Sequence, residues 1–195
     1  MGIEFELKFA ATVEQQEAVA AAYPLAYQPF HMKTTYFDTP SFALSDRKIT
    51  LRRRLENGVS VCTVKTPVST YGRGEWDCKM ERIEDAIQEL CKLGASEELL
   101  TLTAEGVKAV CGARFDRRAG VVAFGDSQLE LALDQGILFG GGREIPLCEI
   151  EVELKSGSPE DAVNFAMALA HRFGLQPEHL SKFRRSLALA KGEKI

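Results

Sequence analysis

Apolar and charged residues alternate at the start of the chain. The stretch Ile3–Phe9 has large apolar residues at its odd positions and the charged residues Glu4, Glu6 and Lys8 at its even positions. Since successive side chains of a strand point to opposite faces, this pattern predicts a strand with one face suited to a core. The other face carries two carboxylates and one ammonium group.

The same period-two pattern recurs along the chain. The charged residues that share a strand face are Arg52 and Arg54 in 49–55, Glu130 and Asp134 in 129–134, and Glu149, Glu151 and Glu153 in 149–155. Arg73 has the parity of Glu75, and Lys65 is the last charged residue of its predicted strand. Charged strand faces are therefore a property of the whole chain.

Cap, turn and β-branched residues divide the chain into elements. The expected helices are 13–21, 83–93, 97–110, 159–173 and 182–190, with one helical turn at 40–44. The expected strands are 3–9, 33–39, 48–55, 59–66, 73–80, 113–118, 121–124, 128–134, 136–139 and 144–155. Asn57-Gly58 indicates a hairpin turn, and Ser158-Pro159 is typical of a helix start.

Two arrangements of these strands fit the alternation. An antiparallel sheet with one solvated face gives the same pattern. However, Glu149, Glu151 and Glu153 would repel one another unless a cation lay between them, and Arg52 and Arg54 have the complementary problem. About eight strands could instead close into a barrel with a charged interior and helices outside. The fold class is α+β in either case, and we expect one domain over residues 1–195.

Composition limits the class of protein. With 45% hydrophobic and 27% charged residues, the chain has the composition of a soluble globular protein, and its net charge of −4 argues against a general nucleic-acid binder. No apolar run is long enough for a membrane span and no leader precedes the first strand, so a cytoplasmic protein without membrane contact is expected. Five cysteines without a CxxC pair predict free thiols.

The charges of such an interior favour one kind of ligand. Carboxylates on several strands suit Mg²⁺ or Mn²⁺, which prefer hard oxygen ligands, better than zinc. Arginines opposite them suit phosphate through bidentate hydrogen bonds. The sequence has neither a phosphate-binding GKS/GKT loop nor a GxSxG motif. A metal-bound oligophosphate is therefore the expected ligand.

These residues resemble a known family. Glu4-x-Glu6-x-Lys8 is similar to the ExExK signature of the CYTH superfamily, the triphosphate tunnel metalloenzymes. Further similar segments follow in the family's order, namely Tyr36–Pro40, Leu51–Arg54, the strand end at Lys65, Arg73–Glu75, Leu133–Gly136, Glu149–Glu151 and Ser181–Phe183. The bacterial inorganic triphosphatase branch is the most similar, especially in Gln128–Gly136.

The resemblance implies an eight-stranded antiparallel tunnel in which triphosphate is hydrolysed to diphosphate and phosphate with Mg²⁺ or Mn²⁺. By position it assigns phosphate binding to Lys8, Arg52, Arg54, Lys65, Arg117 and Lys182, with Arg73 as a weaker candidate. It assigns metal binding or positioning of the attacking water to Glu4, Glu6, Asp134, Glu149 and Glu151, with Glu130 and Glu153 as helpers. Among these, Glu4, Glu6 and Lys8 are the expected catalytic residues. Arg117 is preferred to Arg118, and Arg118, Arg184 and Arg185 are interpreted as surface or helix-end charges.

Alternative functions remain open at this point. Other activities of the family are thiamine triphosphate hydrolysis and nucleotide cyclisation of the class IV adenylate cyclase type. A non-catalytic polyphosphate-binding module is a third alternative, although the acidic residues favour an enzyme, an inorganic triphosphatase. The expected partner is a small triphosphate, and the chain would be a monomer or a homodimer. Because a helical CHAD domain often follows this domain in bacterial triphosphatases, the chain is either a compact protein or part of a longer one.

Overall fold

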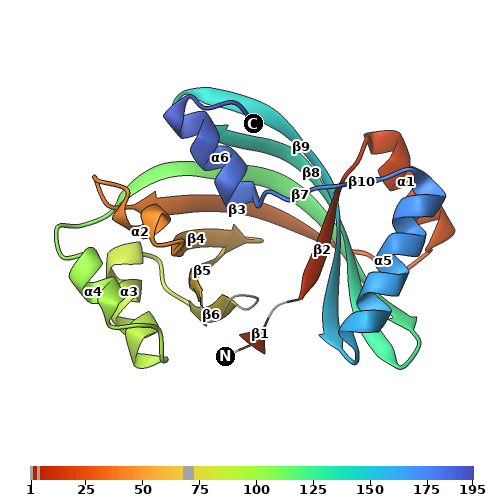
Figure 1. Cartoon of the computed structure of the whole chain (residues 1–195), viewed down its shortest axis with the longest axis horizontal. Helices are drawn as coiled ribbons and strands as arrows, with labels where there is room; N and C mark the ends of the chain where they lie inside the picture. The colour runs from red at the N-terminus through yellow and green to blue at the C-terminus, as the bar shows by residue number, and fades with distance from the viewer. Residues whose placement is uncertain (1, 4, 68–72) are drawn as a thin grey trace.

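A computed structural model describes residues 2, 3, 5–67 and 73–195, with the backbone alone at residues 2, 3 and 73. The described part is a mixed α+β structure with one antiparallel sheet and six helices (Figure 1). The strands are β1 (Gly2–Ile3), β2 (Glu6–Ala10), β3 (Gln28–Asp38), β4 (Thr50–Glu56), β5 (Val59–Pro67), β6 (Arg73–Cys78), β7 (Lys108–Phe124), β8 (Ser127–Gly140), β9 (Arg143–Ser156) and β10 (Gln176–Pro177). The helices are α1 (Val13–Ala22), α2 (Ala43–Asp46), α3 (Ile83–Lys92), α4 (Glu98–Leu102), α5 (Pro159–Phe173) and α6 (Lys182–Lys191).

The first residues of the chain pair with strands at both ends of the sheet. The hydrogen-bonded order is β1-β6-β5-β4-β3-β7-β8-β9-β2-β10, so the ladder is linear and does not close. At one end Gly2 pairs with Glu75, and at the other Lys8 pairs with Glu151. Residues 2–10 therefore connect the two ends of a strongly curved sheet. It has ten strands rather than the eight expected, because β1 and β10 add two-residue strands at its edges.

The two middle strands are longer than predicted. The sequence suggested breaks near Gly120 and Gln135, but β7 and β8 run through both positions. Gly120 and Gly136, which were expected to lie at or beside turns, instead allow close packing inside the strands. A Cβ at Gly120 would lie 2.8 Å from the Cβ of Leu25, and one at Gly136 would lie 2.1 Å from the carbonyl oxygen of Arg114.

Two other element boundaries differ from the prediction. The helix expected over 97–110 is limited to α4, since Gly106 has a φ of +90° and β7 begins at Lys108. Strand β3 begins at Gln28 rather than at residue 33 and includes Pro29. Proline has no backbone N–H to donate to a neighbouring strand. This is tolerated at Pro29 because pairing of β3 with β4 begins only at Met32.

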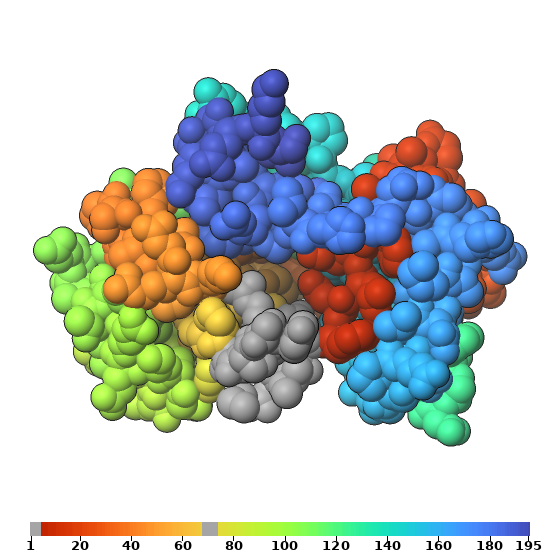
Figure 2. Space-filling model, in the orientation of Figure 1, coloured from red at the N-terminus to blue at the C-terminus, as the bar shows by residue number. Residues whose placement is uncertain are grey.

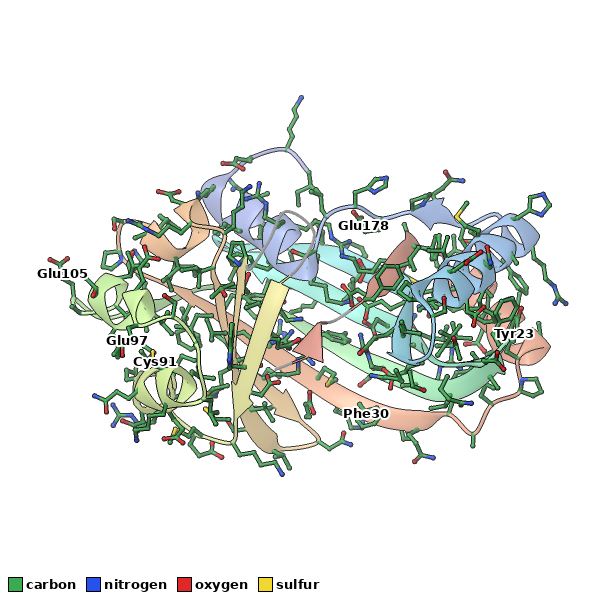
Figure 3. The ribbon with its side chains drawn as sticks, turned by 60° about the horizontal axis from the view of Figure 1, so that its bottom comes forward. Tyr23, Phe30, Cys91, Glu97, Glu105 and Glu178 are labelled. Carbon is green, nitrogen blue, oxygen red and sulfur yellow. The ribbon has the colours of Figure 1, made fainter. Side chains whose placement is uncertain are left out.

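Helices cover the convex face of the sheet at its two ends. Leu131, Leu133 and Ile150 pack against Phe165 and Leu169 of α5, and α1 joins this core through Val19. At the other end α3 and α4 pack on β4 and β5. Figure 3 shows this separation, with Cys91 and Glu97 at one end and Tyr23 at the other.

Helix α6 lies instead on the concave face. Its Leu189 packs with Ala113 and Phe115, whose side chains share the face of Arg117 on β7. Figure 2 shows the segment between α5 and α6, in blue, crossing above the red residues of β2. The sheet, α6 and this segment therefore surround an interior space.

Candidate functional site

The concave face encloses a cavity of about 670 Å³. Its charged lining residues are Glu6, Lys8, Arg52, Arg54, Glu56, Lys65, Glu75, Asp77, Arg117, Glu151, Glu153 and Lys182. Glu6, Glu151 and Glu153 come from β2 and β9, and the arginine pair comes from β4, where Glu56 and the β6 carboxylates of Glu75 and Asp77 accompany it. The charged strand faces found in the sequence therefore face one another across a shared space.

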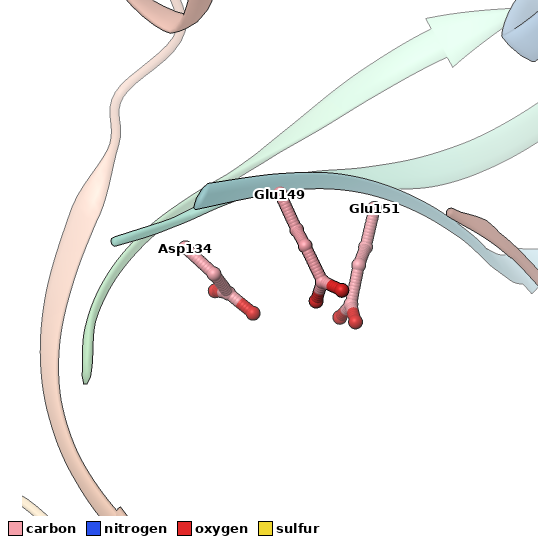
Figure 4. A group of neighbouring side chains, drawn as sticks. All are labelled: Asp134, Glu149 and Glu151. Carbon is pink, nitrogen blue, oxygen red and sulfur yellow. The ribbon is translucent and has the colours of Figure 1, made fainter. Parts of the chain in front are cut away.

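Three carboxylates form a compact buried group in the part of the cavity wall made by β8 and β9. Asp134 of β8 and Glu149 of β9 are register partners, and Glu151 follows two residues later on the same face of β9. One carboxylate oxygen from each lies within 4.8 Å of the others (Figure 4). Asp134 and Glu149 are fully buried and Glu151 is nearly so. Asp134, Glu149 and Glu151 together form the carboxylate cluster.

Lys182 lies at the centre of the carboxylate cluster. Its Nζ is 2.9 Å from Asp134, 2.6 Å from Glu149 and 2.6 Å from Glu151. Burial alone would lower the pKa of Lys182, but these carboxylates outweigh burial and raise it. The Ser181 hydroxyl accepts a hydrogen bond from the Arg184 N–H and so caps α6, which fixes Lys182 at the first position of the helix.

Arg117 binds the cluster from the neighbouring strand β7. It donates hydrogen bonds of 2.7 and 2.8 Å to Asp134 and another to Glu151. Burial would raise the pKa of Glu151, but Lys182 and Arg117 reverse this effect and lower it. Glu151 is therefore ionised, and it contacts two protein cations.

The donor set of the cluster fits a hard divalent cation. Carboxylate oxygens are the ligands that Mg²⁺ and Mn²⁺ prefer. Glu149 Oε2 is buried and, among the described residues, accepts no hydrogen bond, its nearest charge being the Lys182 ammonium. This oxygen has an unused lone pair, so the cluster could coordinate a metal once the Lys182 side chain moves.

Arg52 and Arg54 form the opposing basic wall. Arg52 lies 3.2 Å from Glu75, and Arg54 lies 3.1 Å from Glu56. Within the described part of the chain, the Nε of each arginine is buried and has no hydrogen-bond partner. Burial and the nearby Arg52 lower the pKa of Arg54. A bound anion would satisfy both Nε groups and relieve the repulsion between the guanidinium groups.

The structure brings most of the predicted site residues together. Those that line the cavity are Glu6, Lys8, Arg52, Arg54, Lys65, Arg117, Glu151, Glu153 and Lys182. Asp134 and Glu149 lie in its wall. Glu4 lies outside the described residues, as does the side chain of Arg73.

Glu130 is placed differently from the other predicted ligands. It is the register partner of Glu153, which pairs in turn with Glu6, so these three glutamates form one row across the sheet. Lys155 contacts both Glu130 and Glu153, at 3.6 and 2.9 Å. Glu130 does not line the cavity and lies two positions along the strand face from Asp134.

Arg185 is a site residue that the sequence interpretation missed. It is buried, donates a hydrogen bond to Glu149 and lies 3.4 Å from Glu178, which Figure 3 places on the segment between α5 and α6. Its spacing of three residues from Lys182 puts both cations on one face of α6, which was the available signal. Arg118, by contrast, pairs with the exposed Glu17, as its interpretation as a surface charge predicted.

Comparison with known proteins gives consistent matches. The CYTH domain model matches residues 2–187. The inorganic triphosphatase of Haemophilus influenzae is 30% identical over 195 residues, which cover 95% of this chain and 54% of that protein. A Bacillus subtilis relative, named for a triphosphatase activity, is 41% identical over 66 residues, or 33% of this chain and 35% of its own. The chain thus spans about half or less of these curated relatives.

Solved structures show the same fold. A Hippeastrum protein described with a dominant triphosphatase activity aligns with a TM-score of 0.62 at 17% identity, covering 100% of this chain and 98% of its own. A Pyrococcus horikoshii OT3 protein aligns with a TM-score of 0.61 at 21% identity, covering 93% and 97%. None of the helices in the described ranges has the length and apolar character that crossing a membrane requires.

Proposed function

The chain belongs to the CYTH domain family, and from this we propose that it hydrolyses inorganic triphosphate to diphosphate and phosphate with Mg²⁺ or Mn²⁺. The observation that carries the proposal is the pair of opposed charged walls around one cavity. A carboxylate cluster forms one wall, and two arginines with unsatisfied Nε groups form part of the other. A cationic wall alone would suit anion binding, whereas the buried carboxylates also offer oxygen ligands to a cation that binds with the anion.

The cavity residues can hold a substrate that consists almost entirely of charge. Lys8, Arg52, Arg54, Lys65, Arg117 and Lys182 supply the cations, with Arg73 as a further candidate from the sequence. On binding, Lys182 and Arg117 would exchange carboxylate contacts for phosphate contacts. Positioning and charge neutralisation of this kind account for most of the catalysis in phosphoryl transfer.

The carboxylate cluster would hold the metal, with Glu4, Glu6, Glu130 and Glu153 as the further ligands proposed from the sequence. When bound, the metal would supply charge neutralisation at the phosphate oxygens and a water of lowered pKa. Glu6 faces the cavity beside Lys8, 3.8 Å away, and would orient the attacking water. Lys8 would then bind the phosphoryl group that is transferred.

The aromatic residues of the cavity favour an inorganic substrate over an organic triphosphate. Tyr36, Phe115 and Phe183 line the cavity but are at most 7% exposed, and the fourth lining aromatic, Phe5, is half-buried and packs against the hydrophobic core. Tyr36 packs on Phe183 with ring centroids 5.0 Å apart, and the Lys182 ammonium lies over the ring of Phe115. These ring faces are already in contact with protein groups, so they are not available to stack on a base or a thiazole ring.

The first test is phosphate release from tripolyphosphate, ATP and thiamine triphosphate, each with Mg²⁺, Mn²⁺ or EDTA. We expect metal-dependent release from tripolyphosphate far above the other two, and a loss of about 100-fold or more in kcat for Glu6→Gln. Glu17→Gln, at an exposed carboxylate on α1, is the matched control and should retain full activity. Metal-independent release, or equal rates on all three substrates, would contradict the proposal.

Thermal unfolding separates catalysis from binding. Tripolyphosphate with Mg²⁺ at about 100 times Kd should stabilise the native state by about 2.7 kcal/mol, which raises Tm by several degrees. A raised Tm without phosphate release would identify a polyphosphate-binding module. An unchanged Tm at saturating ligand would rule out binding in the cavity.

A further inference from the structure

A buried glutamine lies directly behind the carboxylate cluster. Gln16 of α1 is 1% exposed, although it is a polar residue on the core side of a helix. Its side-chain Nε2 donates to the backbone carbonyl oxygens of Asp134, at 2.9 Å, and Glu149, at 2.8 Å. Both hydrogens of one amide group are thus used on the two register partners whose side chains begin the cluster.

The two contacts act on the orientation of the metal-facing side chains. A carbonyl oxygen has two lone pairs, so it can accept a bond from Gln16 in addition to its partner in the sheet. Gln16 approaches from the convex side with α1, while the carboxylates point into the concave side. Because each carbonyl is rigidly joined to its own Cα, a donor shared by both fixes the relative position of the two carboxylates.

Helix α1 is itself held firmly in place. The Thr12 hydroxyl caps the helix by accepting a hydrogen bond from the Gln15 N–H, and the Gln15 side-chain oxygen accepts one from the Thr12 N–H. The Gln15 Nε2 also donates to the carbonyls of Phe173 and Gly174 at the end of α5, at 3.0 and 3.2 Å. Adjacent glutamines therefore make the same type of bond, one to α5 and the other to the cluster strands.

We propose that Gln16 is a positioning residue for the metal site formed by Asp134, Glu149 and Glu151. The proposal rests on the proposed function only in taking the cluster as the metal site. Residues that orient metal ligands through hydrogen bonds typically contribute 10- to 100-fold to affinity, and Gln16 does so here through the backbone of the ligands. Its own side chain does not contact the substrate cavity.

The test is Mn²⁺ binding measured by calorimetry on the wild-type chain, Gln16→Met and Gln15→Met. Methionine matches the length of glutamine but donates no hydrogen bond. We expect Gln16→Met to weaken Mn²⁺ binding by about 10-fold, with a raised KM for the metal and a smaller effect on kcat at saturating metal. Gln15→Met loses its two donated bonds to the end of α5 and the bond it accepts from Thr12, so it should lower Tm but bind Mn²⁺ within about 2-fold of wild type.

Equal Mn²⁺ affinity in wild type and Gln16→Met, or equal losses in both variants, would overturn the proposal. If Gln16→Met does not fold, NMR of the wild type gives the answer. Titration with Mg²⁺ should shift the side-chain amide signals of Gln16 and leave those of Gln15 in place, and unshifted Gln16 signals would overturn the proposal.

The same data distinguish this proposal from the proposed function. A wild-type chain that binds no Mn²⁺ would count against the metal-dependent activity itself. A wild-type chain that binds Mn²⁺ normally, with no effect of Gln16→Met, would reject only the role of Gln16.

Discussion

Three cationic side chains contact the carboxylate cluster. The three carboxylates Asp134, Glu149 and Glu151 are matched by the three cations Arg117, Lys182 and Arg185. Arg117 and Lys182 face the cavity, whereas Arg185 does not line it. Under the proposed function, Arg185 is the cation that would stay with Glu149 when the other two contact phosphate.

Removal of Arg185 should destabilise the folded chain. Arg185→Met leaves the buried Glu149 with fewer counter-charges, and breaking a buried pair in this way typically costs about 3–5 kcal/mol. Urea unfolding should show a loss in this range. The adjacent Arg184 is exposed, so Arg184→Met should change the unfolding free energy by less than about 0.5 kcal/mol.

A double variant checks that the loss comes from the unpaired charge. Glu149→Gln combined with Arg185→Met should regain part of the stability, because no buried charge is then left alone. If Arg184→Met and Arg185→Met lowered the free energy of unfolding equally, the ion pair of Arg185 with Glu149 would not contribute to stability.

Strand parity predicted which charged residues share a strand face, but the placement of α6 was not predicted. Parity put Arg52 and Arg54 on one face, and position in the family's motif order preferred Arg117 to Arg118. The structure places all three preferred arginines on the cavity. Arg185 was missed because all helices were expected outside the sheet, whereas α6 packs on its concave face. Gln16 was missed because a glutamine in a helix gives no sign of a buried backbone contact.

Among the elements, the close contact of β7 and β8 sets the position of Asp134. Gly136 lies two residues beyond Asp134, and β7 leaves no room for a side chain there. A register shift at this point would move Asp134 relative to Arg117, its partner on β7.

Gly136→Ala should therefore disturb both stability and metal binding. Overpacking of this kind typically costs about 1–3 kcal/mol, and displacement of Asp134 should weaken Mn²⁺ binding. Gly142→Ala is the control, because no atom lies within 4 Å of its added Cβ and only its left-handed backbone, φ +74°, opposes alanine. Gly142→Ala should lose about 1 kcal/mol and bind Mn²⁺ normally. Normal Mn²⁺ binding by Gly136→Ala would show that this strand contact does not position the site.

Element types were predicted more reliably than element lengths. Asn57-Gly58 forms the expected hairpin turn with positive φ at both residues, and Ser158 caps α5 as its sequence indicated. The lengths of β7 and β8 were wrong because a glycine required for close packing looks the same in sequence as a glycine required for a turn. Only the neighbouring strand distinguishes the two cases.

For the molecule as a whole, buried thiols limit stability at alkaline pH. Burial raises the pKa of Cys62 from 9.0 to about 11 and that of Cys111 to about 12. In the unfolded chain both thiols ionise near pH 9, while in the folded chain they stay protonated. The unfolded state therefore binds fewer protons above pH 9, and the stability present below that pH is lost as the pH rises toward 11 or 12.

Urea unfolding between pH 7 and 10.5 measures this loss. The free energy of unfolding should be flat with respect to these thiols up to about pH 9 and then fall by up to about 1.4 kcal/mol per pH unit for each thiol. Cys62→Ala with Cys111→Ala should reduce the slope above pH 9, even though both substitutions lower stability at neutral pH. An identical slope in the double variant would assign the alkaline loss to other groups.

The N-terminal segment that joins both ends of the sheet also sets an order of events during synthesis. Its β2 residues leave the ribosome well before their partners on β9 and β10 are made. Until β9 has emerged, β2 has no long neighbouring strand, and until residue 182 has emerged the acidic wall lacks Lys182. Pairing over such sequence distances is slow and leaves unpaired edges exposed. In a nascent chain β2 therefore stays unpaired on this side until β9 is made, and the charged interior forms only after Lys182 has been added.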